Sequence, residues 1–128
     1  MSPVEELRWL EYGQRLLYGR RNVAASEAEP HSGARLFRAA LAGGSQALGQ
    51  QTGSIAAGHA ADLVELNADH PLLRGGDGDE LLDRLVFAGN RPLVTNVMVG
   101  GRPVVRDGRH VLAASAAAAF ADVMARTP

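Results

Sequence analysis

Four histidines are the residues of this sequence best suited to metal or acid–base chemistry: His31, His59, His70 and His110. A hydrolytic zinc site usually needs ligands at short spacing, such as His-x-His or two histidines one helical turn apart. Here each histidine stands alone in the sequence. We therefore predict that all four lie in turns or at strand edges, and that this chain contains no catalytic, metal-binding or cofactor-binding residue.

Two groups of acidic residues could be read as a calcium site or as an acid–base pair. Residues 77–80 read Asp-Gly-Asp-Glu but lack the spaced ligands of a calcium loop, so Asp77 or Asp79 is better explained as a helix cap. Glu5 and Glu6 could be imagined as an acid–base pair. Neighbouring helix positions point in different directions, however, and the helix dipole favours both residues in a first turn. We predict structural roles for all of them.

Other catalytic classes lack their motifs. The glycines Gly49, Gly53 and Gly58 are not spaced as a phosphate loop, and the sequence contains no lysine to complete one. No serine lies in a Gly-x-Ser-x-Gly elbow. The absence of cysteine excludes disulfides, thiolate zinc ligands and cysteine nucleophiles. The residues alone therefore assemble no convincing active site.

Composition narrows the possible partners. The formal net charge is -1, the basic residues are scattered arginines, and aromatic residues are only 5%, which argues against nucleic acid as a partner. No apolar run approaches the roughly 20 residues that span a bilayer. The first residues alternate apolar side chains with Glu and Arg, unlike a signal peptide. We expect a cytoplasmic protein with neither a membrane nor a nucleic-acid partner.

The first 50 residues predict two helices. Ser2, Pro3 and Glu5 form a capping box with proline at the first helical position, and the helix should end near Gly19. Its apolar stripe comprises Leu7, Trp9, Leu10, Tyr12, Leu16 and Leu17. Residues 20–30 read as a surface loop.

A second helix should run from Ser32 or Gly33 to a C-cap at Gly49. Gly43 and Gly44 inside it suggest that another backbone packs closely there, because each glycine costs about 1 kcal/mol relative to alanine.

The second part of the sequence predicts a small β layer with two helices. Strands are expected at residues 53–55, 61–66, 94–99, 102–106 and 109–112, with a hairpin turn at Gly100-Gly101. Pro103 should place its strand at an edge. A short helix is expected over residues 79–87, and a terminal helix over 115–126 should be capped by Ser115 and bury its apolar side chains: Phe120, Val123 and Met124.

The predicted order of elements is unusual for a self-contained fold. The first two helices have broad apolar faces but no sheet of their own to cover. We expect the missing layer to belong to a preceding part of a longer chain. Exposed helix faces of this kind favour self-association or a strained structure.

Two motifs resemble those of the amidohydrolase superfamily. Residues 39–49, followed by 53–64, read Ala-Ala-Leu-Ala-Gly-Gly-Ser-Gln-Ala-Leu-Gly and then Gly-Ser-Ile through Gly-His-Ala-Ala-Asp-Leu-Val. This resembles the passage that closes the barrel of these enzymes and enters their C-terminal β-sandwich, although His59 stands where a basic residue is common. Residues 97–109 resemble the hairpin that completes the sandwich.

Within the superfamily, residues 4–16, 20–22, 85–89 and 106–110 resemble the formimidoylglutamate deiminases of histidine degradation. The resemblance implies an α/β fragment. Residues 1–50 would be the last helices of a (β/α)8 barrel, and residues 51–128 part of the composite β-sandwich. It also implies a parent enzyme with zinc or another divalent metal, which hydrolyses the C–N bond of N-formimidoyl-glutamate with a metal-activated water.

The resemblance further implies that the metal ligands of the parent enzyme precede Met1, so the isolated chain is expected to be inactive. Two alternatives stay open. One is a stand-alone interaction or oligomerisation module. The other is a fragment of a different amidohydrolase, of the chlorohydrolase or guanine deaminase type.

Overall fold

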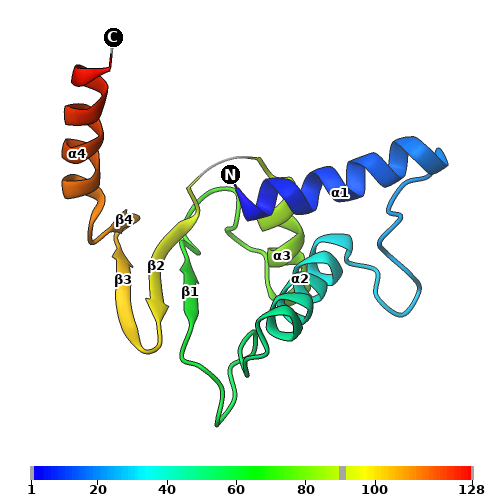
Figure 1. The fold of residues 1–128 in the computed structure, drawn as a ribbon. Helices are drawn as coiled ribbons and strands as arrows, with labels where there is room; N and C mark the ends of the chain where they lie inside the picture. The colour runs from blue at the N-terminus through cyan, green and yellow to red at the C-terminus, as the bar shows by residue number, and fades with distance from the viewer. Residues whose placement is uncertain (1, 90–91, 128) are drawn as a thin grey trace.

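Three helices gather beside a small antiparallel sheet, and a fourth helix stands apart from them (Figure 1). The structure is a computed structural model that describes residues 2–89 and 92–127. Within these residues the elements are α1 Pro3–Tyr18, α2 Ser32–Leu48, β1 Leu63–Leu66, α3 Gly78–Phe87, β2 Val94–Val99, β3 Arg102–Arg106, β4 Arg109–His110 and α4 Ala113–Arg126. The mixed α/β class is confirmed.

The ends of α1 and α2 follow the predicted capping signals. Ser2 Oγ accepts a hydrogen bond from the Glu5 backbone N–H at 3.4 Å. Gly19 and Gly49 end the two helices with φ near +60°, a left-handed conformation that glycine adopts without a Cβ clash. No helix in the described part of the chain is long and apolar enough to cross a membrane.

The inner face of α1 mixes apolar and charged side chains, and its outer face is apolar. Glu11 is only 1% exposed, whereas Trp9 is 63% and Leu16 84% exposed. The apolar stripe that the sequence predicts for this helix therefore lies largely on its solvent side. Such an arrangement departs from the usual amphipathic pattern, in which the apolar side chains of a surface helix face the core.

The hydrophobic core is small and lies where the three helices meet the sheet. Its centre is Leu73, Leu85 and Leu93, all nearly fully buried. The partly buried side chains around it come from α1, α2, α3 and β1: Val4, Phe37, Leu66, Leu81 and Leu82. Three helices are thus joined to the first sheet strands by one cluster.

The sheet is an antiparallel meander in the order β1-β2-β3-β4. Gly100 and Gly101, with φ of +55° and +76°, form the predicted hairpin turn between β2 and β3. Pro103 lies on the part of β3 that β4 does not cover, since β4 pairs only with Val105 and Arg106. The hairpin turn matches the prediction. The strand of Pro103 is not an edge strand as predicted, because β4 pairs with the last two residues of β3.

One predicted strand is absent and another begins later than predicted. Residues 53–55 form no strand, and β1 begins at residue 63 rather than 61. Asp62 does not belong to the strand. Its carboxylate accepts hydrogen bonds from the Gly100 N–H at 2.7 Å and from Thr52 Oγ1 at 3.4 Å. The Asp62 side chain thus connects two loops at the position where the strand was predicted to begin.

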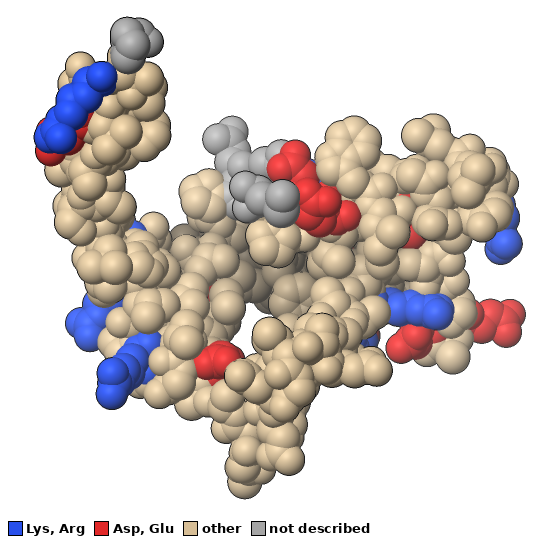
Figure 2. Space-filling model, viewed as in Figure 1, with Lys and Arg blue, Asp and Glu red and all other residues tan. Residues whose placement is uncertain are grey.

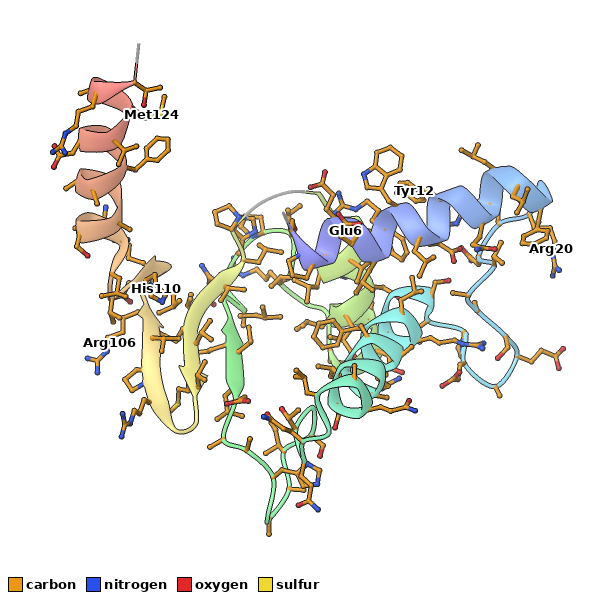
Figure 3. The ribbon with its side chains drawn as sticks, viewed as in Figure 1. Glu6, Tyr12, Arg20, Arg106, His110 and Met124 are labelled. Carbon is orange, nitrogen blue, oxygen red and sulfur yellow. The ribbon has the colours of Figure 1, made fainter. Side chains whose placement is uncertain are left out.

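The predictions for α4 also need correction. This helix begins at Ala113, so Ser115 lies in its first turn, where its hydroxyl donates to the Leu112 carbonyl instead of capping the helix. The preceding strand β4 ends at residue 110 rather than 112. Phe120, Val123 and Met124 were expected to be buried, but each is more than half exposed. Figure 3 shows Met124 on a helix that stands away from the others.

The close backbone approach occurs at a different glycine from those predicted. A Cβ added to Gly43 or Gly44 would meet nothing within 4 Å. At Gly33 it would lie 2.7 Å from the Asp83 Cα and 3.0 Å from the Leu82 carbonyl oxygen. Helices α2 and α3 therefore touch at the start of α2, while the glycine pair further along remains open.

Candidate functional site

Charged side chains, together with the apolar cluster described above, hold the three helices in place. Glu11 Oε1 accepts from Arg15 Nε at 2.7 Å and from the Val23 N–H at 2.8 Å, while Oε2 accepts from the Ala24 N–H at 2.9 Å. A buried carboxylate needs such donors because its desolvation is costly. Glu11 therefore fastens the loop after α1 to the helix, and it was not among the residues singled out from sequence.

Asp83 and Arg8 complete this arrangement at two helix ends. Asp83 on α3 accepts from the Gly33 N–H at 2.6 Å and lies 2.7 Å from His31 Nδ1, so it caps α2 from a neighbouring helix. Arg8 on α1 donates to the carbonyls of Val86 at 2.7 Å and Gly89 at 3.0 Å, at the end of α3. Helices α1 and α3 thus each supply a charge to the backbone of another helix.

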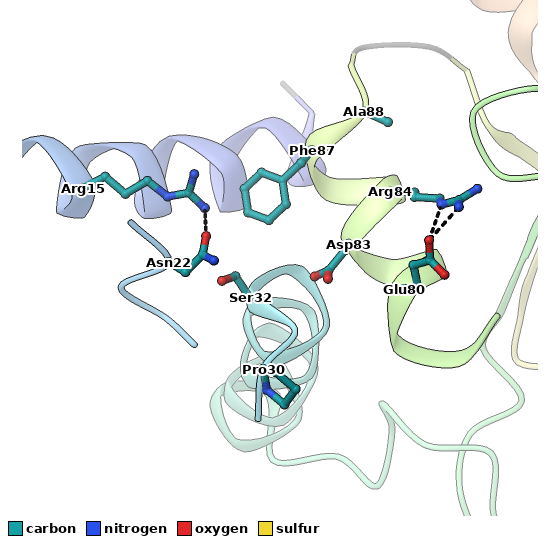
Figure 4. Close-up of a pocket in the computed structure, with 9 residues that line it drawn as sticks. All are labelled: Arg15, Asn22, Pro30, Ser32, Glu80, Asp83, Arg84, Phe87 and Ala88. Atoms are coloured by element: carbon teal, nitrogen blue, oxygen red, sulfur yellow. Dashed lines mark hydrogen bonds and ion pairs between the residues drawn. The ribbon is translucent and has the colours of Figure 1, made fainter. Parts of the chain in front are cut away.

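A shallow hollow of about 450 Å³ lies between these elements (Figure 4). Its lining is Arg15, Asn22, Pro30, Ser32, Glu80, Asp83, Arg84, Phe87 and Ala88. Arg84 donates to Glu80 at 2.6 Å. Arg15 pairs with Glu11 and donates to Asn22 at 3.0 Å, and Asp83 lies 2.7 Å from His31. The two arginines and two carboxylates of the lining carry equal and opposite formal charges, which leaves little net charge to attract a ligand.

Ser32 is the one lining residue with an unmet hydrogen bond. It is 5% exposed, and its hydroxyl finds no partner among the described residues. A nucleophilic serine needs a base within hydrogen-bond reach. The hydroxyl makes no such bond here, so the hollow does not have the geometry of a serine hydrolase site.

Aromatic rings form the wall of this region. Tyr12 and Phe87 stack with their ring centroids 5.9 Å apart, and the Arg15 guanidinium lies 5.4 Å from each ring centroid. A cation above aromatic faces is stabilised by the ring quadrupoles. Arg15 therefore joins the α1–α3 contact to the Glu11 cluster.

The four histidines lie far apart in sequence and have local partners. Three match the predicted turn or strand-edge positions: His59 bonds Ser54 Oγ at 2.8 Å, and His70 and His110 accept from the N–H groups of Leu72 and Leu112. His31 is different, because it precedes α2 and pairs with Asp83.

In the acidic run of residues 77–80, one residue stands at a helix N-cap and two form ion pairs. Asp77 stands at the N-cap of α3 without a side-chain cap bond. Asp79 instead accepts two hydrogen bonds from Arg38 on α2, and this interaction lowers the pKa of Asp79 and raises that of Arg38. Glu80 pairs with Arg84. Asp77 therefore occupies the predicted N-cap position, although its side chain makes no cap bond, whereas Asp79 does not cap the helix.

A resident zinc ion does not fit the described part of the chain. Across residues 2–89 and 92–127, no three histidine, aspartate or glutamate side chains come close enough together to hold a metal ion. The donors that a hydrolytic site requires are instead committed to helix ends and ion pairs.

Comparison with known proteins supports the resemblance noted in the sequence. The chain is 52% identical over 124 residues to formimidoylglutamate deiminase of Pseudomonas aeruginosa PAO1, covering 97% of this chain and 27% of that enzyme. The crystal structure of an amidohydrolase from Brucella melitensis matches 98% of this chain with a TM-score of 0.84 and 37% identity. This chain again spans 27% of that structure. No family model matches the chain.

Proposed function

We propose that this chain is the C-terminal part of an amidohydrolase of the formimidoylglutamate deiminase type, acting in histidine degradation. The observation that carries the proposal is 52% identity over nearly the whole chain to an enzyme of that name. The TM-score of 0.84 to an amidohydrolase supports it from the fold. The resemblance of residues 39–64 and 97–109 to superfamily motifs agrees with both.

In the complete enzyme the reaction is the hydrolysis of N-formimidoyl-L-glutamate. Water adds to the formimino carbon, the bond from that carbon to the terminal nitrogen breaks, and ammonia leaves with N-formyl-L-glutamate as the other product. Among the described residues of this chain, no three histidine, aspartate or glutamate side chains lie close enough together to hold the metal for this step. Their contribution is structural, through the cluster of caps around Glu11, Asp83 and Arg8.

The proposed placement follows the order of elements. Helices α1 and α2 would be the last helices of the catalytic barrel, and the sheet with α3 and α4 would belong to the composite β-sandwich. The parent enzyme would hold zinc or another divalent metal on residues outside this chain. By itself the chain would therefore be inactive.

An exchange experiment tests the proposal. The segment of the P. aeruginosa enzyme that matches this chain is replaced by residues 1–128, and ammonia release from N-formimidoyl-L-glutamate is measured for this chimera and for the isolated chain. We expect activity in the chimera within about tenfold of the parent and none in the isolated chain. A folded but inactive chimera would refute the family assignment, and turnover by the isolated chain would refute its inactivity.

The alternative is an independent interaction module. The observation that favours it is the exposure of large apolar side chains on α1, including Trp9 and Leu16. A discrete homo-oligomer in sedimentation, combined with a chimera that does not fold, would support this alternative over the enzyme fragment.

A further inference from the structure

The outer face of α1 is an apolar surface without a covering layer. We define it as Trp9, Leu10, Gly13, Leu16 and Leu17, whose four large side chains are 53–84% exposed. Helical spacing places these residues on one side, opposite Glu11. Figure 2 shows that the visible surface over α1 is largely uncharged beyond an acidic group near the start of the helix.

The total exposed area shows that much of the surface is uncovered. A compact monomer of 13.5 kDa exposes about 6,500 Å². This chain exposes 9441 Å². The excess of roughly 2,900 Å² exceeds one partner's share of a standard protein–protein interface, about 800 Å². A covering partner must therefore be large.

Gly13 adds a geometric feature to the outer face. A Cβ at this position would meet nothing within 4 Å, so the helix backbone itself is accessible between the two pairs of bulky residues. A neighbouring element can approach the helix closely at a glycine. The outer face of α1 thus has projecting apolar side chains on both sides of an accessible glycine, as surfaces that pack against another element do.

Two candidate occupants remain, a second copy of this chain or the rest of an amidohydrolase. Apolar side chains are exposed in separate places, on α1 and on α4, which stands apart in Figure 1. One two-fold contact buries a single patch on each copy. The two relatives, by contrast, carry the matching segment within chains nearly four times as long. A longer chain that surrounds this segment can cover the apolar side chains of both α1 and α4, which a single two-fold contact does not.

We propose that the outer face of α1 is an interface for the remaining, larger part of an amidohydrolase chain, which packs on Trp9 and Leu16 and approaches the backbone at Gly13. This proposal rests on the proposed function, because the partner is the enzyme that the comparisons point to. It concerns packing alone, so it can be tested without measuring activity.

The test uses the chimera described above and the isolated chain, each with paired substitutions. Trp9→Arg with Leu16→Glu places charges on the face, while Trp9→Phe with Leu16→Met keeps it apolar. Arginine, glutamate and methionine are all good helix formers, so helix propensity changes little. We expect the charged pair to lower the Tm of the chimera by at least about 5 °C and the apolar pair by less than about 2 °C.

In the isolated chain the same charged pair should leave the Tm unchanged, because both side chains are already exposed. Trp9 is the single tryptophan of the sequence, so acrylamide quenching of its fluorescence reports directly on this face. We expect it to be freely quenched in a monomeric isolated chain. Tolerance of the charged pair in the chimera would overturn the proposal.

Two further outcomes would also overturn it. One is concentration-dependent shielding of Trp9 in the isolated chain, abolished by Leu16→Glu, which would assign the face to a second copy. The other is failure of the unsubstituted chimera to give soluble protein. An inactive chimera that still shows the difference between the charged and apolar pairs would keep this interface and reject only the proposed reaction.

Discussion

At the scale of single residues, the structure depends on a few charges that bond to backbone groups of other elements. Glu11 is the most buried of them, and each of its carboxylate oxygens accepts from a backbone N–H. Bonds between a charged acceptor and backbone donors are stronger than neutral ones when water is excluded. The loop of residues 20–30 is therefore held by one side chain of α1.

Replacement of Glu11 by glutamine should test this directly. The amide has one acceptor oxygen instead of two, so a backbone N–H of residue 23 or 24 loses its partner and Arg15 loses its counter-charge. We expect a loss of about 2–3 kcal/mol in the free energy of unfolding, measured by urea denaturation. Glu6→Gln, at an exposed position of the same helix, should change it by less than about 0.5 kcal/mol. Equal effects of the two would contradict the assigned role.

Two glycines of α2 should respond in opposite ways to alanine. Gly33→Ala places a Cβ 2.7 Å from the Asp83 Cα, which forces α2 and α3 apart and should cost about 1–3 kcal/mol. Gly43→Ala meets nothing within 4 Å and should stabilise the helix by up to about 1 kcal/mol. Urea denaturation of both variants checks the pair. A stable Gly33→Ala protein would show that the helices do not touch at this point.

These residues show where sequence reasoning succeeds and fails at this scale. Ser2, Gly19 and Gly49 act through local backbone geometry, which spacing along the chain reveals. Asp83 caps the start of α2 through Gly33, which lies 50 residues away in sequence, so no local pattern could identify it. Glu11 did leave a signal, because Arg8, Glu11 and Arg15 recur at helical spacing on one face.

At the scale of elements, α2 and α3 are joined by the surface pair of Arg38 and Asp79. The hydrogen bond from Arg38 lowers the pKa of Asp79 below its ordinary value of 3.8. A lowered carboxyl pKa adds stability that is fully present above the ordinary value and is lost as the pH falls through the lower, folded-state value. The pair is exposed, so salt screens it and its contribution is small.

Asp79→Asn should therefore flatten the pH dependence of stability below about pH 4. Unfolding midpoints in urea would be compared between pH 5 and pH 2.5, at low and at high salt. The difference between the variant and the parent protein should shrink on acidification and with added salt. Glu27→Gln, in the exposed loop, serves as the control. A difference that grows at low pH would reverse the assigned sign.

Helix α4 is the element with the least tertiary support. Its large apolar side chains are all more than half exposed, and isolated helices of this length are only marginally stable in water. We expect its backbone amides to exchange with deuterium about as fast as an unstructured peptide, while amides in the first half of α2 are protected. Deletion of residues 113–128 should leave the Tm within about 2 °C. Strong protection of α4 would mean that it docks in solution.

The elements themselves were largely predictable, whereas their partners were not. Hydrophobic spacing and glycine turns located α1, α2 and the β2–β3 hairpin. The burial of Phe120 in α4 could not be judged, because an apolar stripe indicates that a helix has a partner without indicating whether that partner is in the same chain. The short β4 likewise depends on pairing at Val105 and Arg106, which the sequence does not fix.

At the scale of the whole molecule, this chain exposes more surface, and more apolar side chains, than a compact globular protein of its size. The similarity to a deiminase covers nearly all of the chain but only 27% of that enzyme. The sequence indicated this through helices with no sheet to cover. The excess exposed area and the exposed apolar face of α1 give the same indication independently.

This property leads to a quantitative expectation for unfolding of the isolated chain. An unfolded chain of 13.5 kDa exposes about 19,600 Å², so unfolding from 9441 Å² uncovers roughly three quarters of the area that a compact protein of this size would uncover. The denaturant m-value scales with that area. We expect a urea m-value about a quarter below that of compact proteins of equal length. In the chimera the same segment gains a covering layer, so hydrogen exchange in α1 should slow markedly. A full-sized m-value for a monomeric isolated chain would mean that α1 and α4 fold back onto the body in solution.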